Sequence, residues 1–150
     1  MSFNYTFQKI LDVKKKEKGQ AEKNYTKSLH TLRLEESKLY QLQQNKEEME
    51  QRFVQQAEKN MSLAELKHSY LYLDHMHKLI VDAEQSKTAA ESDVHQKQEV
   101  LTEKAMDEKI WAKLKENSYV KHLETMKQLE QKQLDEIAVT RYYRRTVKAR

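Results

Sequence analysis

The side chains of this sequence that could do chemistry are its histidines and its neighbouring carboxylates. His75 and His77 point to different faces of a helix, and His68 lies two turns before His75, so the three are too far apart to share one ion unaided. Glu47 and Glu48 are adjacent on a helix that we expect to be exposed, where they are solvated charges and not an acid and a base. We therefore predict no metal ion and no catalytic residue.

Two scarce residue types exclude further chemistry. The single glycine, Gly19, cannot form the glycine-rich loop that holds a phosphate group. The absence of cysteine excludes disulfides and thiolate metal sites. No nucleophile stands beside a base in a recognisable motif. We therefore expect a non-enzymatic protein that needs no cofactor and binds other proteins.

The composition favours helices throughout. Among 150 residues there is no proline, 35% are charged, and the strand-forming residues Val, Ile and Phe are scarce. Hydrophobic residues make up 37% and are too thinly spread to fill a compact core, so we expect an elongated all-α protein. No apolar run approaches the length of a membrane span and no secretory signal begins the sequence, so we expect the protein in the cytoplasm.

A chain this polar could also be disordered, and the periodicity of its apolar residues decides against that reading. Over residues 4–59, apolar residues recur at spacings of three and four, as in the seam between two helices. Polar residues on the same frame weaken the seam and predict marginal stability. The apolar members are Phe7, Leu11, Ala21, Tyr25, Leu32, Leu39, Leu42, Met49 and Phe53, and the polar members are Lys14, Lys18, Ser28, Glu35 and Lys46.

Signals for a reversal of the chain follow this first helix. Asn60 suits the left-handed conformation after a helix end. Ser62 and Glu65 have the spacing of a capping box, in which each side chain binds the other residue's backbone amide. Met61 and Leu66 flank the box at the positions of a hydrophobic staple. Together they predict that a second helix begins at Ser62.

The second helix is expected over residues 62–140, with a basic tail at 141–150, in a single domain of residues 1–150. Its apolar frame changes phase near Ala105, as in a coiled-coil stutter. A tight turn at 60–62 makes the helices antiparallel, so residue i should lie opposite roughly residue 121 minus i. The expected fold is therefore an all-α antiparallel coiled-coil hairpin with a longer second helix. The second frame comprises Leu66, Tyr70, Leu73, His77, Ile80, Ala83, Ala90, Val94 and Leu101, then Ile110, Leu114, Tyr119, Leu123, Met126, Leu134 and Ile137.

The end of the second helix should have no partner within the chain, because it outruns the first helix by roughly 35 Å. An uncovered apolar stripe usually marks a binding surface. The basic tail that follows could be a frayed, solvated terminus or could contact an acidic protein, an anionic membrane or nucleic acid, although the rest of the chain is slightly acidic. The candidate binding residues here are Val120, Leu123, Met126, Leu134 and Ile137 on the stripe, with Arg141, Arg144 and Arg145 in the tail.

A second candidate surface lies near the start of the second helix. Tyr70, Leu73, His77 and Ile80 form a face of aromatic and aliphatic side chains. This face can pack in the seam or can dock a partner near the tip of the hairpin. Both can hold at once, because a two-helix seam leaves the flanks of such side chains exposed.

Three segments at the start, middle and end of the sequence form a recognisable series. Residues 3–14 read aromatic-x-Phe and then Gln-Lys-Ile-Leu-Asp, and residues 132–138 read Lys-Gln-Leu-Asp-Glu-Ile-Ala. Between them, residues 96–115 carry Gln-Lys-Gln-Glu-Val-Leu-Thr-Glu-Lys and, further on, Trp111. In this order, and over nearly the whole chain, the segments resemble the FliJ family of flagellar export proteins.

The resemblance implies a cytoplasmic component of the flagellar type III export apparatus, peripheral to the cell membrane at the flagellar base and needed for motility and chemotaxis. FliJ proteins are similar in shape to the stalk of rotary ATPases. The resemblance therefore implies three partners: the ring of the export ATPase FliI, whose assembly FliJ promotes, the export-gate protein FlhA, and export chaperones. Tyr70 and Leu73 match the family's gate-associated face, so the face from Tyr70 to Ile80 is assigned to the gate, and the stripe and tail to the ATPase ring.

Two other readings stay open from the sequence. The apolar stripe could join two chains in a generic structural or nucleic-acid-associated homodimeric coiled coil, whereas the hairpin predicts a monomer when free. The stalk proteins of virulence type III secretion systems share the same physical pattern.

Overall fold

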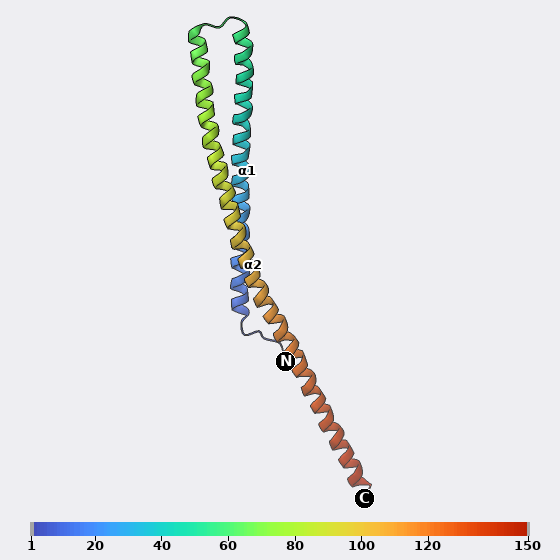
Figure 1. The fold of residues 1–150 in the computed structure, drawn as a ribbon. Helices are drawn as coiled ribbons and strands as arrows, with labels where there is room; N and C mark the ends of the chain where they lie inside the picture. Colours follow the sequence, from blue (N-terminus) through green and yellow to red (C-terminus); the bar gives the residue numbers. More distant parts are fainter. Residues whose placement is uncertain (1, 150) are drawn as a thin grey trace. The chain divides into compact units, whose positions relative to one another are not determined.

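The computed structural model describes residues 2–149; Met1 and Arg150, the ends of the expected domain, lie outside the described residues. Two helices, α1 (Gln8–Glu58) and α2 (Leu63–Lys148), make up nearly all of it, and residues 2–149 contain no strand. α2 has 86 residues and α1 has 51. The helices pack against each other and run antiparallel (Figure 1), which confirms the predicted all-α hairpin with a longer second helix.

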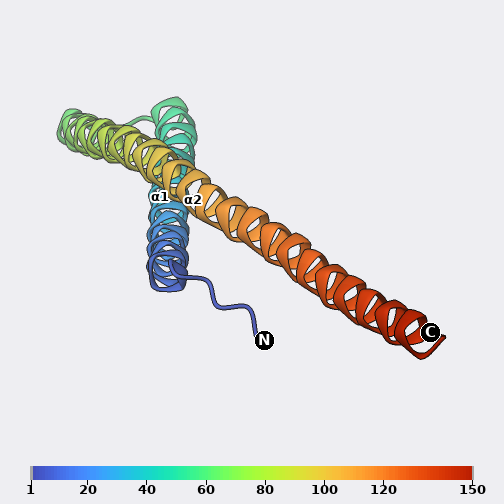
Figure 2. The ribbon, with the colours of Figure 1, turned by 90° about the horizontal axis from the view of Figure 1, so that it is seen from below.

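The helix bounds differ from the expected ones at the two ends of the chain. Residues 2–7 are not helical, and α1 begins after them, at Gln8 (Figure 2). α2 continues through the expected tail as far as Lys148. Arg145 and Lys148 lie in its last turn, where basic side chains interact favourably with the negative end of the helix dipole. Most of the expected tail is therefore the exposed end of α2.

The described residues belong to two compact units, Lys18–Glu103 and Met1–Glu17 with Lys104–Arg150. In Lys18–Glu103 the chain reverses at Asn60, whose φ is 64°. Asn tolerates this left-handed conformation better than most residues. The Ser62 backbone N–H donates to Glu65 Oε2 at 3.4 Å, and the Glu65 N–H donates to Ser62 Oγ at 3.2 Å. The left-handed Asn60 and the capping box are both confirmed.

The seam in Lys18–Glu103 contains few buried side chains. On α1, the least exposed positions follow the predicted three-and-four frame as far as Phe53. Ser28 is buried on this frame, because its hydroxyl donates a 2.7 Å hydrogen bond to the Tyr25 carbonyl of the same helix. The seam is therefore thin and partly polar, and its buried residues are Ala21, Ser28, Leu39, Met76, Ile80 and Ala90.

The frame on α2 matches the predicted one from Ile80 to Leu101 and differs from it by one position at Tyr70 and His77, near the turn. Met76 is only 4% exposed, whereas His77 is exposed. Ser69 is likewise less exposed than Tyr70, which is 71% exposed. The assignment of Tyr70 and His77 to the seam is therefore wrong. A thioether loses no strong hydrogen bonds to water on burial, so Met76 fills the seam with less desolvation cost than an imidazole would.

In Met1–Glu17 with Lys104–Arg150, residues 2–7 and the first turns of α1 pack on α2. Leu11 is the most buried side chain, at 2% exposed. The least exposed positions of α2 keep the three-and-four spacing from Trp111 to His122. The predicted change of phase near Ala105 is therefore wrong, and four residues of the shifted frame are exposed: Ile110, Leu114, Tyr119 and Leu123.

Aromatic packing explains why this frame does not shift. The Phe7 ring lies 5.9 Å from the Trp111 ring, between centroids. The Phe3 ring lies 5.2 Å from that of Tyr119 and 5.3 Å from that of His122. A large ring gains more from one aromatic partner than an aliphatic side chain does, so Trp111 and His122 outweigh the aliphatic residues one position away.

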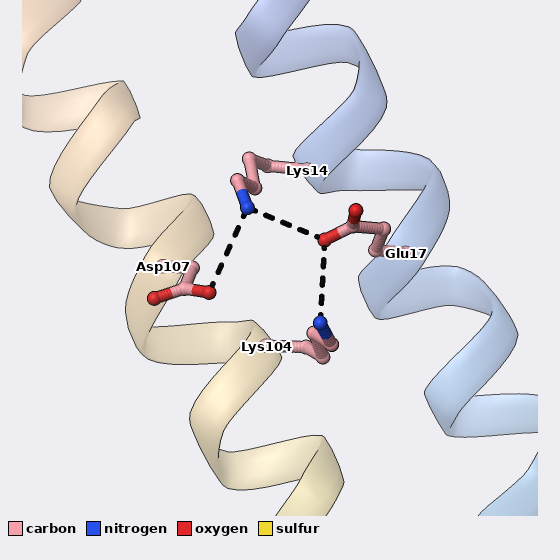
Figure 3. Close-up of polar contacts among 4 residues, drawn as sticks. All are labelled: Lys14, Glu17, Lys104 and Asp107. Atoms are coloured by element: carbon pink, nitrogen blue, oxygen red, sulfur yellow. Dashed lines mark hydrogen bonds and ion pairs between the residues drawn. The ribbon is translucent and has the colours of Figure 1, made fainter.

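Four charged side chains fix the register in this unit (Figure 3). Lys14 Nζ lies 3.9 Å from Asp107 Oδ2, and Lys104 Nζ lies 3.5 Å from Glu17 Oε2, so both pairs join α1 to α2. Lys14 Nζ also lies 3.5 Å from Glu17 Oε2, which links the two pairs into one network. The residue numbers of each interhelical pair add up to 121, so the predicted register holds here.

The capping box predicts a loss of stability on removal of the Ser62 hydroxyl. Ser62→Ala should lower the free energy of unfolding by about 1 kcal/mol, because one amide at the start of α2 loses its acceptor. Chemical denaturation followed by circular dichroism measures the change. Ser86→Ala is the matched control, since Ser86 is exposed in the middle of α2 and alanine there should leave stability unchanged or slightly higher. Equal effects of the two changes would contradict the capping role.

The seam on α2 predicts opposite outcomes for two adjacent residues. Met76→Ala should lower the free energy of unfolding by about 2 kcal/mol or more, because it leaves a cavity in the seam. His77→Ala should change it by less than about 0.5 kcal/mol, as for an exposed residue. Thermal and urea unfolding of both variants provide the measurement. A larger loss for His77→Ala than for Met76→Ala would restore the frame expected from the sequence.

Candidate functional site

The last part of α2 has no covering element among the described residues. Met126 is the last described side chain of α2 that is not exposed, and every side chain in 127–149 is exposed. Figure 2 shows this part of α2 continuing as a single helix beyond the start of α1. We define residues 123–148 as the overhang.

An apolar stripe follows one face at the start of the overhang. Leu123, Leu134 and Ile137 are 42%, 60% and 50% exposed, and Met126 is half-buried. Val120, one turn before Leu123, is 47% exposed. Spacings of three and four place these side chains on a common helix face, as predicted. A large exposed apolar stripe of this kind can bind an apolar groove on another protein.

The same face becomes basic towards the end of α2. Arg141 lies one turn after Ile137, and Arg144 and Arg145 lie one turn further, all of them exposed. Glu130 is the one acidic residue at this spacing between Leu123 and Arg141. The overhang therefore presents an apolar stripe followed by guanidinium groups, which fits a groove with carboxylates at one end.

The tip residues predicted from the sequence divide into two groups. Tyr70 and His77 are exposed, whereas Leu73 is half-buried and Ile80 is 7% exposed. Leu73 and Ile80 thus belong to the seam, where they can position a binding face without offering much surface themselves. Tyr70 and His77 can contact another molecule directly.

Sequence reasoning missed the apolar residues beside Tyr70 and His77. Leu63 is 83% exposed and precedes Tyr70 by seven residues, as Tyr70 precedes His77, so the three share one flank of α2. Val81, one turn after His77, extends the flank and is 36% exposed. The seven-residue spacing before Tyr70 predicts Leu63 on this flank, but Leu63 was assigned only to the capping box. We term these four residues the tip flank.

A cleft opens at the turn, where the apolar seam ends. Its volume is about 630 Å³. Glu65 lines it but is engaged in the capping box, and the remaining side chains are mostly polar, so it offers few groups for tight binding of a small molecule. The cleft is lined by Gln56, Lys59, Asn60, Met61, Ala64, Glu65, His68 and Ser69.

The described helices contain neither a cluster of metal ligands nor a membrane-spanning stretch. Within residues 2–149, no group of three His, Cys, Asp or Glu side chains is placed to hold a metal ion. His95 lies 3.1 Å from Glu99 on the same helix, as an exposed pair. Over the same residues, no stretch of helix is both long enough and apolar enough to cross a membrane.

Comparisons with known proteins agree with this architecture. A family model described as "Flagellar FliJ protein" matches residues 3–146. The flagellar FliJ protein of Bacillus subtilis (strain 168) is 28% identical over 142 residues, which cover 95% of this chain and 97% of the relative. A solved structure of CT670 from Chlamydia trachomatis, described as a proposed YscO homolog, shares the fold, with a TM-score of 0.63 at 18% identity over 91% of this chain and 93% of that one.

The family match covers nearly the whole chain, including residues 2–7, both helices and most of the overhang. The relative matches at nearly full length as well. The chain belongs to the flagellar FliJ protein family.

Proposed function

We propose that this protein is a non-enzymatic, stalk-like component of the flagellar type III export apparatus, which binds the export ATPase FliI through its overhang and promotes assembly of the ATPase ring. In this proposal the tip flank contacts the export gate FlhA, and the protein also interacts with export chaperones. It acts in the cytoplasm at the membrane-facing base of the flagellum. Membership of the FliJ family supports the export role.

The exposed face of the overhang carries the proposal. Burying Leu123, Leu134 and Ile137 in a partner would remove apolar surface from water, which contributes about 1.5–3 kcal/mol for each fully buried side chain. Arg141, Arg144 and Arg145 would then meet carboxylates at the edge of the groove and fix the direction of the helix within it.

A homodimer is not needed to cover most of the apolar side chains. The seam between α1 and α2 meets the need for a partner over most of the chain, which favours a monomer in the free state.

The overhang predicts loss of ATPase binding when its stripe is made polar. The double variant Leu123→Asp, Ile137→Asp should weaken binding to the export ATPase by at least about tenfold, because two apolar contacts are replaced by buried charges. Titration of the purified ATPase, with ring formation followed by light scattering, gives the measurement. Motility of cells that carry the variant should fall in parallel.

A matched control keeps the same charge change on the opposite side of the helix. Gln128→Asp, Val139→Asp also adds two carboxylates to the overhang, but at positions facing away from the stripe. Binding should stay within about twofold of the original protein. Wild-type binding and motility in the stripe variant, or equal losses in both variants, would refute the stripe as the ATPase contact.

The tip flank predicts loss of gate binding without loss of fold. Tyr70→Ala, His77→Ala should weaken binding to the cytoplasmic part of FlhA by about fivefold or more, because an exposed aromatic anchor is removed. Affinity measured by calorimetry should fall while the unfolding midpoint stays unchanged. The control His68→Ala, His75→Ala alters two exposed residues, also seven apart, on another side of the helix. Unchanged gate affinity in the Tyr70→Ala, His77→Ala variant would rule out this contact.

A further inference from the structure

The non-helical segment before α1 contacts α2 through two aromatic side chains, Phe3 and Phe7, and the Tyr5 ring lies 5.9 Å from that of Phe7. We refer to residues 2–7 as the strap. Phe3 contacts Tyr119 edge-on and lies against His122, with centroid distances of 5.2 and 5.3 Å. Phe7 contacts Trp111, and Tyr5 is 8% exposed. The strap therefore covers α2 between Trp111 and His122.

The strap is held without polar contacts to the helix that it covers. Within residues 2–149, no hydrogen bond joins residues 2–7 to α2; the strap's own bonds run to the first turn of α1, from the Gln8 N–H to the Tyr5 carbonyl at 3.1 Å and from the Leu11 N–H to the Phe7 carbonyl. The buried Tyr5 hydroxyl has no hydrogen-bond partner among the described residues. A buried hydroxyl without a partner has lost its bonds to water, so this group opposes the burial of Tyr5.

The first turns of α1 have their own contacts with α2, apart from those of the strap. Leu11 is 2% exposed, and the ion pairs of Lys14 and Glu17 join α1 to α2 immediately after it. The strap can therefore leave α2 while the first turns of α1 stay docked. Release would expose the aromatic face of α2 at Trp111 and His122.

The position of Phe3 connects the strap to the overhang. Tyr119 and His122, which Phe3 contacts, come directly before Leu123, the first residue of the overhang. A partner that covers the stripe from Ile137 back to Leu123 therefore meets Phe3 at the next turn of the helix. It must either stop there or take the place of the strap.

We propose that the strap is a releasable latch: a partner bound to the overhang displaces Phe3, Tyr5 and Phe7 and gains the face of α2 from Trp111 to His122 as additional binding surface. The identity of that partner, the export ATPase, rests on the function proposed above. The latch lowers the affinity of the partner for α2, because part of the binding free energy is used to displace the strap from the face between Trp111 and His122.

Trp111 is the only tryptophan in the chain, so its fluorescence reports the strap directly. Quenching by acrylamide should be lower in Tyr5→Phe, because loss of the unpaired hydroxyl favours the closed strap by about fivefold. Quenching should be higher in Phe3→Ala, because the contacts with Tyr119 and His122 are lost. Thr6→Ala changes an exposed strap residue and should match the original protein.

Binding of the same variants to the ATPase completes the test. Affinity for the ATPase should fall severalfold in Tyr5→Phe, because this variant favours the closed strap. It should rise in Phe3→Ala, because this variant favours the open strap. Equal quenching in all variants would overturn the latch. Altered quenching with equal affinities would overturn competition for the face while leaving the proposed function intact. If no variant binds the ATPase, the proposed function fails, whereas quenching that follows the expected order still supports a strap that opens and closes.

Discussion

The reversal of the chain at residues 59–62 constrains everything else in this protein. A link this short forces α1 and α2 to run antiparallel and side by side, with a register set by the turn. Because α1 has 51 residues and α2 has 86, α1 cannot cover all of α2. The overhang follows from this inequality. The stripe and the basic end are thus available to a partner because of where Asn60 and Ser62 place the turn.

The thin seam shapes the binding surfaces that flank it. Small or polar residues such as Ala21, Ser28 and Ala90 occupy buried positions, so the helices pack through a narrow line of contacts. Larger apolar side chains, including Leu63 and Tyr70, remain outside this line and exposed. Charged pairs between α1 and α2 add register specificity where apolar packing is sparse.

Local interactions explain which features the sequence could predict. Asn60, Ser62 and Glu65 act on their own neighbours, so their spacing alone indicates the turn and the cap. The choice between Met76 and His77 in the seam depends on the opposite helix, which periodicity does not reveal. Likewise, the phase of α2 near Trp111 is decided by Phe7, more than a hundred residues earlier in the chain. The periodicity of the sequence therefore predicts the helices and their turn, whereas the side chains that α2 buries depend on residues far away in the chain.

The distance between two labelled residues within one molecule tests the central claim most directly. Arg33 and Thr88 are both exposed, both lie in Lys18–Glu103, and their numbers add up to 121. Spin labels at these positions should lie within about 30 Å of each other, because packed helices are about 8–10 Å apart and the labels add their own length. The distance should persist when labelled protein is diluted with unlabelled protein. A separation near 80 Å, as in one continuous helix, or a short distance that disappears on dilution, would contradict the hairpin and the overhang that depends on it.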